Sequence, residues 1–168
     1  VVPKSGSELI DGLIFGYTLD PDYDFNTPLT ITFSFIDTDS VFYGAPPKEV
    51  VASTEAFETA VSEMFAEIAA LLGINIILVD ETETVVGDIR CGLFNEESNL
   101  LGFCEVSGGI TGNLGIYVDD IGSSSSNVWF NTYNFDQNNI NKGDGIYTTI
   151  VHEIGHAIQD KENYKPLQ

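Results

Sequence analysis

Both histidines of this chain lie on either side of a glutamate, in the segment His152-Glu153-Ile154-Gly155-His156. The residues around this segment, from Asp144 to about Asp160, have the apolar spacing of a helix. Side chains four residues apart share one face of a helix, so His152 and His156 can bind one metal ion from the same side. Because this geometry arises only on a helix, the segment constrains the fold more than any other feature of the chain.

The chemistry of these three side chains predicts a zinc site. Neutral imidazoles bind zinc at about 2.0–2.1 Å, and zinc lowers the pKa of a bound water to about 7. Glu153, next to the first ligand, can take the proton of that water as a general base. The alternative is a purely structural helix in which the spacing arose by chance. The helical context and the absence of any other histidine favour the metal site.

The rest of the chain predicts a single α+β domain over residues 1–168. A period-two pattern over Leu29–Ile36 indicates a half-buried strand. An apolar stripe indicates a helix over Thr54–Leu72, capped by Ser53 or Thr54 and stopped by Gly73. Short apolar runs predict further strands, which are Ile74–Val79 (expected to be central), Val86–Leu93, Asn99–Val106, Ile116–Val118 and Val128–Phe130. No linker interrupts this order of strands and helices.

The charge of the chain is strongly acidic, with 26 acidic and 6 basic residues and a formal net charge of −20. A nucleic-acid partner is therefore not expected, since phosphate binding needs a basic surface. The acidity has three possible origins, which are solubility, a salty environment, and calcium as a second cofactor. No apolar run reaches the length of about 18 residues needed for a membrane span.

The two cysteines predict a disulfide. Cys91 and Cys104 each lie in a strand-like stretch, and two antiparallel neighbouring strands would bring them within bridging distance. A disulfide implies an oxidising compartment, and hence a secreted, extracellular protein. The alternative is two free buried thiols. The opening residues, Val1–Gly6, lack the features of a signal peptide, which fits a mature or trimmed secreted chain but also a cytosolic one.

Several segments occur in an order that resembles the serralysin family of metzincin proteases. They are Leu9–Leu13, Leu29–Phe35, Asp88–Arg90, Asn127–Asn131 and His152–Ala157, so the resemblance extends over nearly the whole chain. The last two are the most specific. The resemblance implies a metzincin-like fold, with a mixed twisted sheet, a backing helix and a metal-binding active-site helix. It also implies a secreted zinc endopeptidase that hydrolyses peptide bonds of a polypeptide substrate with a metal-activated water.

The resemblance further implies a substrate cleft beside the edge of the sheet. Val128, Trp129 and Phe130 would lie near the edge strand that lines this cleft, where an extended peptide can pair. The alternative is that Trp129 and Phe130 fill the core.

The sequence departs from the family after the second histidine. Metzincins extend the motif as H-E-x-x-H-x-x-G-x-x-H and place a methionine turn below the metal. Gln159 holds the glycine position and Glu162 the third-histidine position, while the only methionine, Met64, lies far upstream. Glu162 is the best positional candidate for a third ligand, since carboxylates bind zinc, and Asp160 is the next. Alternatively, Glu162 is a solvated surface residue.

Two functions follow from these observations. The first is a zinc-dependent endopeptidase whose domain is truncated or atypical after the active-site helix, with the lower subdomain missing. The second is a catalytically degenerate metzincin-fold module that acts as an extracellular structural or protein-binding domain. The missing third histidine favours the second function. Glu153 favours the first, because a structural helix has no need of it.

Overall fold

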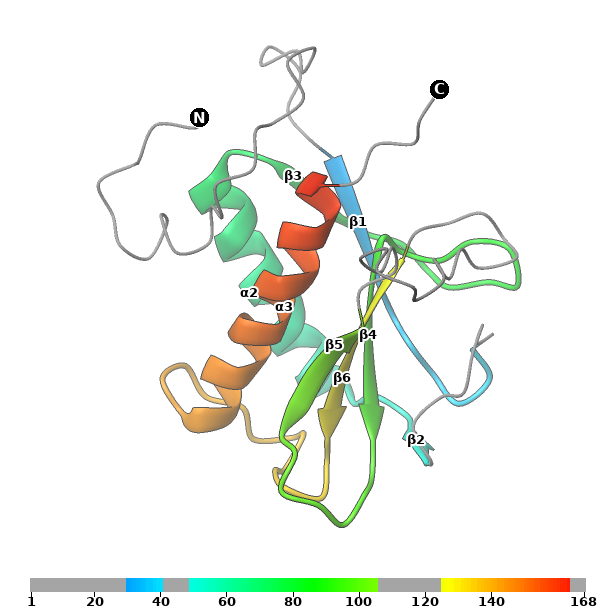
Figure 1. Cartoon of the computed structure of the whole chain (residues 1–168), viewed down its shortest axis with the longest axis vertical. Coiled ribbons are helices and arrows are strands. Elements are labelled where there is room, and N and C mark those ends of the chain that lie inside the picture. The colour runs from blue at the N-terminus through cyan, green and yellow to red at the C-terminus, as the bar shows by residue number, and fades with distance from the viewer. Residues whose placement is uncertain (1–29, 41–48, 106–124, 164–168) are drawn as a thin grey trace, which may run out of the picture.

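The computed structural model describes residues 30–40, 49–105 and 125–163, with side chains up to residue 158. Its elements are β1 (Thr30–Phe35), β2 (Val50–Val51), α2 (Glu55–Leu72), β3 (Asn75–Leu78), β4 (Ile89–Phe94), β5 (Gly102–Glu105), β6 (Ser126–Asn131) and α3 (Gly145–Asn163). Two helices pack against one mixed sheet (Figure 1), so the predicted α+β class is confirmed. The strand predicted at Ile116–Val118 lies outside the described residues.

The sheet has the strand order β3-β1-β4-β6-β5, and β2 pairs with β4 beside this path. The pairs β1–β3, β1–β4 and β4–β6 are parallel, whereas β5 runs antiparallel to β6 and β2 antiparallel to β4. The prediction that β3 is central was wrong, because β3 ends the strand order in the described part of the chain. Ile77 and Leu78 are each 49% exposed. A β-branched run indicates a strand but not its place in a sheet.

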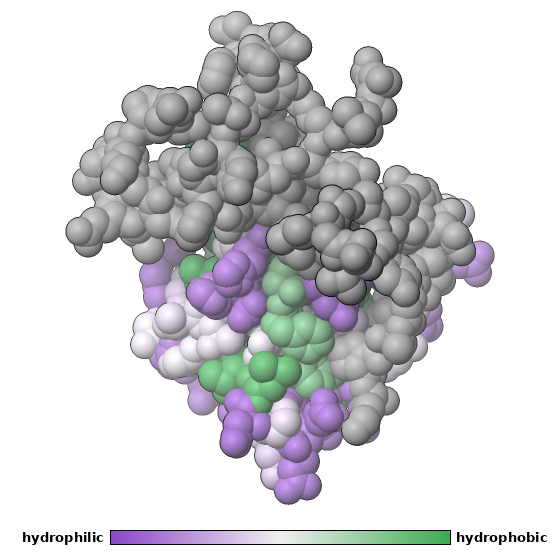
Figure 2. Space-filling view, viewed as in Figure 1, coloured by the Kyte–Doolittle hydropathy of each residue, from purple (hydrophilic) through white to green (hydrophobic). Residues whose placement is uncertain are grey.

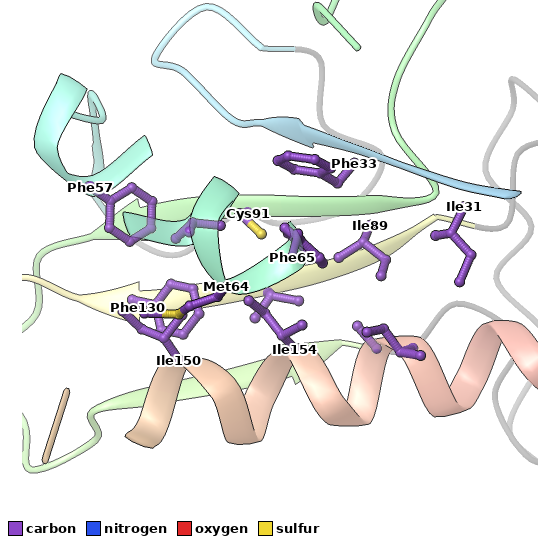
Figure 3. Close-up of a cluster of buried hydrophobic side chains, with 14 of the residues drawn as sticks. Ile31, Phe33, Phe57, Met64, Phe65, Ile89, Cys91, Phe130, Ile150 and Ile154 are labelled. Atoms are coloured by element: carbon purple, nitrogen blue, oxygen red, sulfur yellow. The ribbon is translucent and has the colours of Figure 1, made fainter. Parts of the chain in front are cut away.

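Both helices cover the same face of the sheet. Alternate residues of a strand point to the same side, and those of β1, β4 and β6 on one side form a single core with both helices. Figure 3 shows Ile150 and Ile154 of α3 pointing towards this core. The buried residues are Ile31, Phe33, Ile89, Cys91, Leu93, Val128 and Phe130 from the sheet, Phe57, Val61, Met64 and Phe65 from α2, and Ile150, Ile154, Ala157 and Ile158 from α3.

The helix ends follow from local capping. The hydroxyl of Thr54 accepts a hydrogen bond from the backbone N–H of Phe57 at 3.3 Å, and Gly73 ends α2 with a φ of 69°. At the start of α3, a carboxylate oxygen of Asp144 accepts a hydrogen bond from the backbone N–H of Tyr147 at 2.7 Å. Both predicted helix starts are confirmed. The helix α3 runs to Asn163, a few residues past the predicted end near Asp160.

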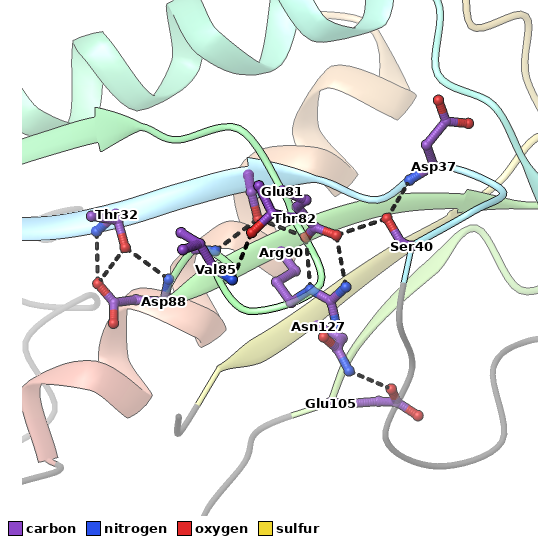
Figure 4. Close-up of polar contacts among 12 residues, drawn as sticks. Thr32, Asp37, Ser40, Glu81, Thr82, Val85, Asp88, Arg90, Glu105 and Asn127 are labelled. Carbon is purple, nitrogen blue, oxygen red and sulfur yellow. Dashed lines mark hydrogen bonds and ion pairs between the residues drawn. The ribbon is translucent and has the colours of Figure 1, made fainter. Parts of the chain in front are cut away.

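A buried ion pair fixes the loop between β3 and β4 to the sheet (Figure 4). Arg90 is only 2% exposed, and its guanidinium donates two hydrogen bonds to the carboxylate of Glu81, at 2.7 and 2.8 Å. The hydroxyls of Ser34 and Ser40 each donate a further hydrogen bond to this carboxylate at 2.7 Å. Such a pair is stabilising only while both partners stay charged, because a lone buried charge is costly.

The stability of the protein is therefore expected to depend on the charge of Glu81. Burial raises the pKa of Glu81, but the hydrogen bonds from Arg90, Ser40 and Ser34 and the charge of Arg90 lower it more, so the pKa lies below 4.5. A carboxyl group whose pKa is lower when folded stabilises the fold above its unfolded pKa, and this stabilisation is lost as the pH falls through the folded value. We expect the free energy of unfolding to decrease as the pH is lowered from 4.5. In Glu81→Gln, the same drop in pH should decrease it less. Urea denaturation over this pH range tests this, and an equal acid-induced loss in both proteins would contradict it.

The disulfide predicted between Cys91 and Cys104 is not formed in the structure, because their strands are not neighbours. Strand β6 lies between them, and both cysteines are register partners of Val128. Two strand spacings amount to about 9.6 Å, which exceeds the limit of about 7 Å between the Cα atoms of a disulfide. Cys91 is present as a free thiol. Burial, together with the charges of Cys104 and Glu81, raises the pKa of this thiol, so Cys91 stays protonated.

Candidate metal centre

The two histidines of α3 converge on one point. Their Nε2 atoms are 3.0 Å apart, and their rings are nearly perpendicular at an interplanar angle of 82°. Two nitrogen ligands of a tetrahedral zinc ion, each at about 2.05 Å, are about 3.3 Å apart. The observed separation is close to this value. It also fits a hydrogen bond between one protonated and one unprotonated ring nitrogen. The donor pair thus fits two positions of a zinc site.

The exposure of the histidines follows from the pattern of α3. One side of α3 faces the core and carries three buried residues, Ile150, Ile154 and Ala157. A residue two positions from a core residue is rotated by about 200° around the axis. His152 stands two positions after Ile150 and two before Ile154, so it points away from the sheet, and His156 follows on the same face. The helix therefore has one face in the core and presents the two histidines on the other.

Glu153 lies at the border between these two faces, beside an open groove of about 380 Å³. The groove runs between α3 and the beginning of β5, and its lining residues are Asn99, Leu100, Leu101, Gly102, Thr148, Thr149, His152 and Glu153. The side chain of Glu153 is half-buried. A carboxylate in this position can exchange protons with water or with a bound molecule in the groove.

Gly102 allows β5 to lie close to β6 at a point beside α3. A Cβ atom at this position would lie 2.9 Å from the carbonyl oxygen of Trp129 and 3.5 Å from Cγ of Glu153. The first distance is shorter than a normal contact, so a side chain at this position would disturb the pairing of β5 with β6, whereas the second distance is an ordinary van der Waals contact. The absence of a side chain leaves the backbone of β5 next to the carboxylate of Glu153.

The backbone of β5 is oriented so that it can pair with an extended chain. The N–H of Asn131 donates to the carbonyl of Leu101 at 2.9 Å, which directs the backbone polar groups of Leu101 towards β6. Along an antiparallel strand, the backbone N–H and C=O groups of successive residues point alternately towards and away from a given neighbour. The groups of Gly102, the next residue, therefore point away from β6. Within the described ranges, β5 pairs with β6 alone. Figure 2 shows an apolar area beside α3 on the side where Figure 1 places β5.

The substrate-binding role predicted for Val128, Trp129 and Phe130 does not agree with their positions. All three lie on β6, behind the edge strand, and are buried. The indole N–H of Trp129 donates to the carboxylate of Glu105 at 3.1 Å. These side chains fill the core and do not line the groove, as the alternative interpretation held. The groove wall from Asn99 to Gly102 was predicted only as a strand, since its place at the edge depends on distant pairings.

The predicted third ligand is not brought to the histidine pair by the helical backbone. Glu162 lies within α3, six residues after His156, so its Cα is about 9 Å further along the axis. Asp160, the second candidate, lies about 12 Å from His152 along the axis. Ligation by Glu162 would require the helix to end earlier. The side chains of Glu162 and Asp160 lie outside the described part of the structure.

The histidine pair has no third ligand among the described residues, and the acidic residues there form no second metal site. In the described ranges, no group of three or more His, Cys, Asp or Glu side chains is arranged to hold a metal ion. This part of the chain therefore offers no candidate site for the calcium ion that the acidic composition suggested.

Comparisons of the chain with known protein families and with characterised proteins gave no match. In the described segments, neither α2 nor α3 combines the length and apolar character needed to cross a membrane.

Proposed function

We propose that this protein is a secreted, serralysin-like zinc endopeptidase with a metzincin-like fold. The observation that carries the proposal is the 3.0 Å separation of the two Nε2 atoms on the exposed face of α3. Glu153 stands between the two ligands in sequence and faces the adjoining groove. The extracellular location rests on the resemblance alone, because the predicted disulfide is not formed.

Each residue of the motif has a separate role in this proposal. His152 and His156 would hold a zinc ion through their Nε2 atoms. When bound, zinc supplies a Lewis acid that polarises the scissile carbonyl and makes water more acidic. The carboxylate of Glu153 accepts a proton from water and then delivers it to the nitrogen of the leaving amine.

The edge strand gives the substrate its orientation. A peptide added as a strand beside β5 would exchange backbone hydrogen bonds with the outward N–H and C=O groups of Gly102. Because Gly102 lies next to Glu153, the same pairing would place a peptide bond near the proposed base. The mixed sheet, its antiparallel edge strand and the motif-bearing helix beside that edge support the metzincin-like assignment.

A second candidate is a catalytically degenerate module with a structural or protein-binding role. It is favoured by the continuous helix of α3, which passes through Gln159 and Glu162, where metzincins have their glycine and third histidine. A helix that does not turn there leaves the ion with only two ligands from this segment.

Metal analysis of the purified chain distinguishes the two candidates. We expect about one zinc per chain, as a single pair of imidazoles binds one ion. The zinc-loaded protein is expected to cleave an unstructured protein, and a chelator should abolish this activity until zinc is restored. Retention of zinc without cleavage would favour the module. A protein that retains no zinc after loading would contradict the metal site.

A further inference from the structure

The wall of the groove is formed by residues that burial does not hold in place. Leu100 and Leu101 are 46% and 41% exposed, although both line the groove opposite Glu153. Burial of apolar area is the main force that fixes an apolar side chain, and these two leucines bury only part of their apolar area. Some other interaction must fix the segment from Asn99 to Leu101.

Two asparagines supply that interaction, one at the end of β6 and one three residues after it. The buried Asn131 donates hydrogen bonds from Nδ2 to the carbonyl oxygens of Glu96, at 2.8 Å, and Leu100, at 3.0 Å. The Nδ2 atom of Asn134 donates to the same Leu100 carbonyl at 2.8 Å and to the carbonyl of Ser98 at 3.0 Å. The Leu100 carbonyl thus accepts two hydrogen bonds and has both lone pairs occupied.

Asn131 also serves as an acceptor for the same loop. Its Oδ1 atom accepts hydrogen bonds from the N–H groups of Glu96 and Tyr133, at 3.1 and 3.2 Å. The side chain therefore joins the beginning and the end of the β4–β5 loop to the end of β6. Figure 1 shows this loop and the segment after β6 next to each other at the same end of the sheet.

We infer that Asn131 and Asn134 are positioning residues that hold the Asn99–Leu101 wall of the groove in place for the substrate. Neither side chain lines the groove, so their effect is transmitted through the Leu100 carbonyl. The inference rests on the proposed function for its substrate, but the arrangement of the wall can be measured without any activity.

The test uses Asn134, because it is exposed and its replacement should leave the core intact, whereas Asn131 is buried. Asn134→Ala removes the amide, and Asn134→Asp keeps its shape but removes both donors. Asn138→Ala is the matched control, since Asn138 is an exposed asparagine whose amide contacts Asp136 and not the groove wall.

We expect hydrogen exchange of the backbone amides of residues 96–102 to accelerate by about fivefold or more in both Asn134 variants, the effect of losing one or two hydrogen bonds. KM for peptide cleavage should rise by a similar factor, with kcat and zinc affinity changed less than about twofold, because the wall orients the substrate and does not touch the metal. The control should behave as the wild type.

Unchanged exchange in both variants would overturn the inference. Faster exchange with an unchanged KM in an active enzyme would overturn it as well, since the wall would then be loosened without consequence for the substrate. If zinc-loaded wild-type protein cleaves nothing, the proposed function fails, and hydrogen exchange alone decides whether the two asparagines hold the wall.

Discussion

Replacement of Glu153 by glutamine is expected to lower kcat/KM of the zinc-loaded protein by about 10²–10⁴-fold, the usual contribution of a general base. Glutamine has nearly the same shape but cannot take up a proton at neutral pH. The zinc content is expected to stay the same, because the proposed ligands are the Nε2 atoms of His152 and His156. Initial rates on an unstructured protein, measured beside elemental analysis of the same sample, test both parts of this expectation.

Glu63→Gln is the matched control for this change. Glu63 is an exposed glutamate on α2, so the substitution removes the same charge from a helix surface outside the groove. Activity near the wild-type level is expected for this control. If Glu153→Gln retained activity within a few fold of the wild type, Glu153 would not be the base, and any hydrolysis would have another origin.

Replacement of His156 by alanine is expected to lower zinc affinity by more than about 100-fold. Loss of an outer-shell partner of a metal site costs about 10–100-fold, and loss of a ligand costs more. Hydrolysis should be lost together with the metal. Since His156 is exposed, the free energy of unfolding of the metal-free protein should change by no more than about 0.5 kcal/mol. Competition with a chromophoric chelator measures the affinity, and urea denaturation measures the stability.

Thr148→Ala serves as the control for the histidine variant. Thr148 is exposed on α3 and lines the same groove, but it offers no imidazole. Its zinc affinity is expected to match that of the wild type. Equal affinity in His156→Ala and the wild type would show that the ion is held elsewhere, and the pairing of His152 with His156 would then have no role in metal binding.

The helices could be predicted from the sequence because their signals are local. The apolar stripe of α2, its cap at Thr54 and its stop at Gly73 all lie within one segment, and the structure has them as expected. The motif of α3 is local in the same way, since its histidines need only a helix to share a face. The strands themselves were also found, apart from the two-residue β2.

The order of the strands could not be predicted, and this explains the errors. Alternation of apolar residues specifies which face of a strand is buried but not which strand lies beside it. The hydrogen bond from the backbone N–H of Thr32 to the carboxylate of Asp88 joins residues 56 positions apart, and no local sequence pattern predicts it. The disulfide failed for this reason, because β6 lies between the two cysteine-bearing strands. The groove wall was missed likewise, since Asn134 and Leu100 are 34 positions apart.

The location of both histidines within one turn of α3 affects how metal binding is linked to folding. The Nε2 atoms meet across four residues, so the pair needs a helical turn but no contact with the sheet. An isolated helix is costly to nucleate, and an ion bound across one turn offsets part of that cost. If the pair binds zinc, we expect the unfolded chain to keep some affinity for it, and a ligand that binds both states stabilises the fold only by the difference between the two affinities. Zinc bound by this pair would thus stabilise the helix more directly than the domain.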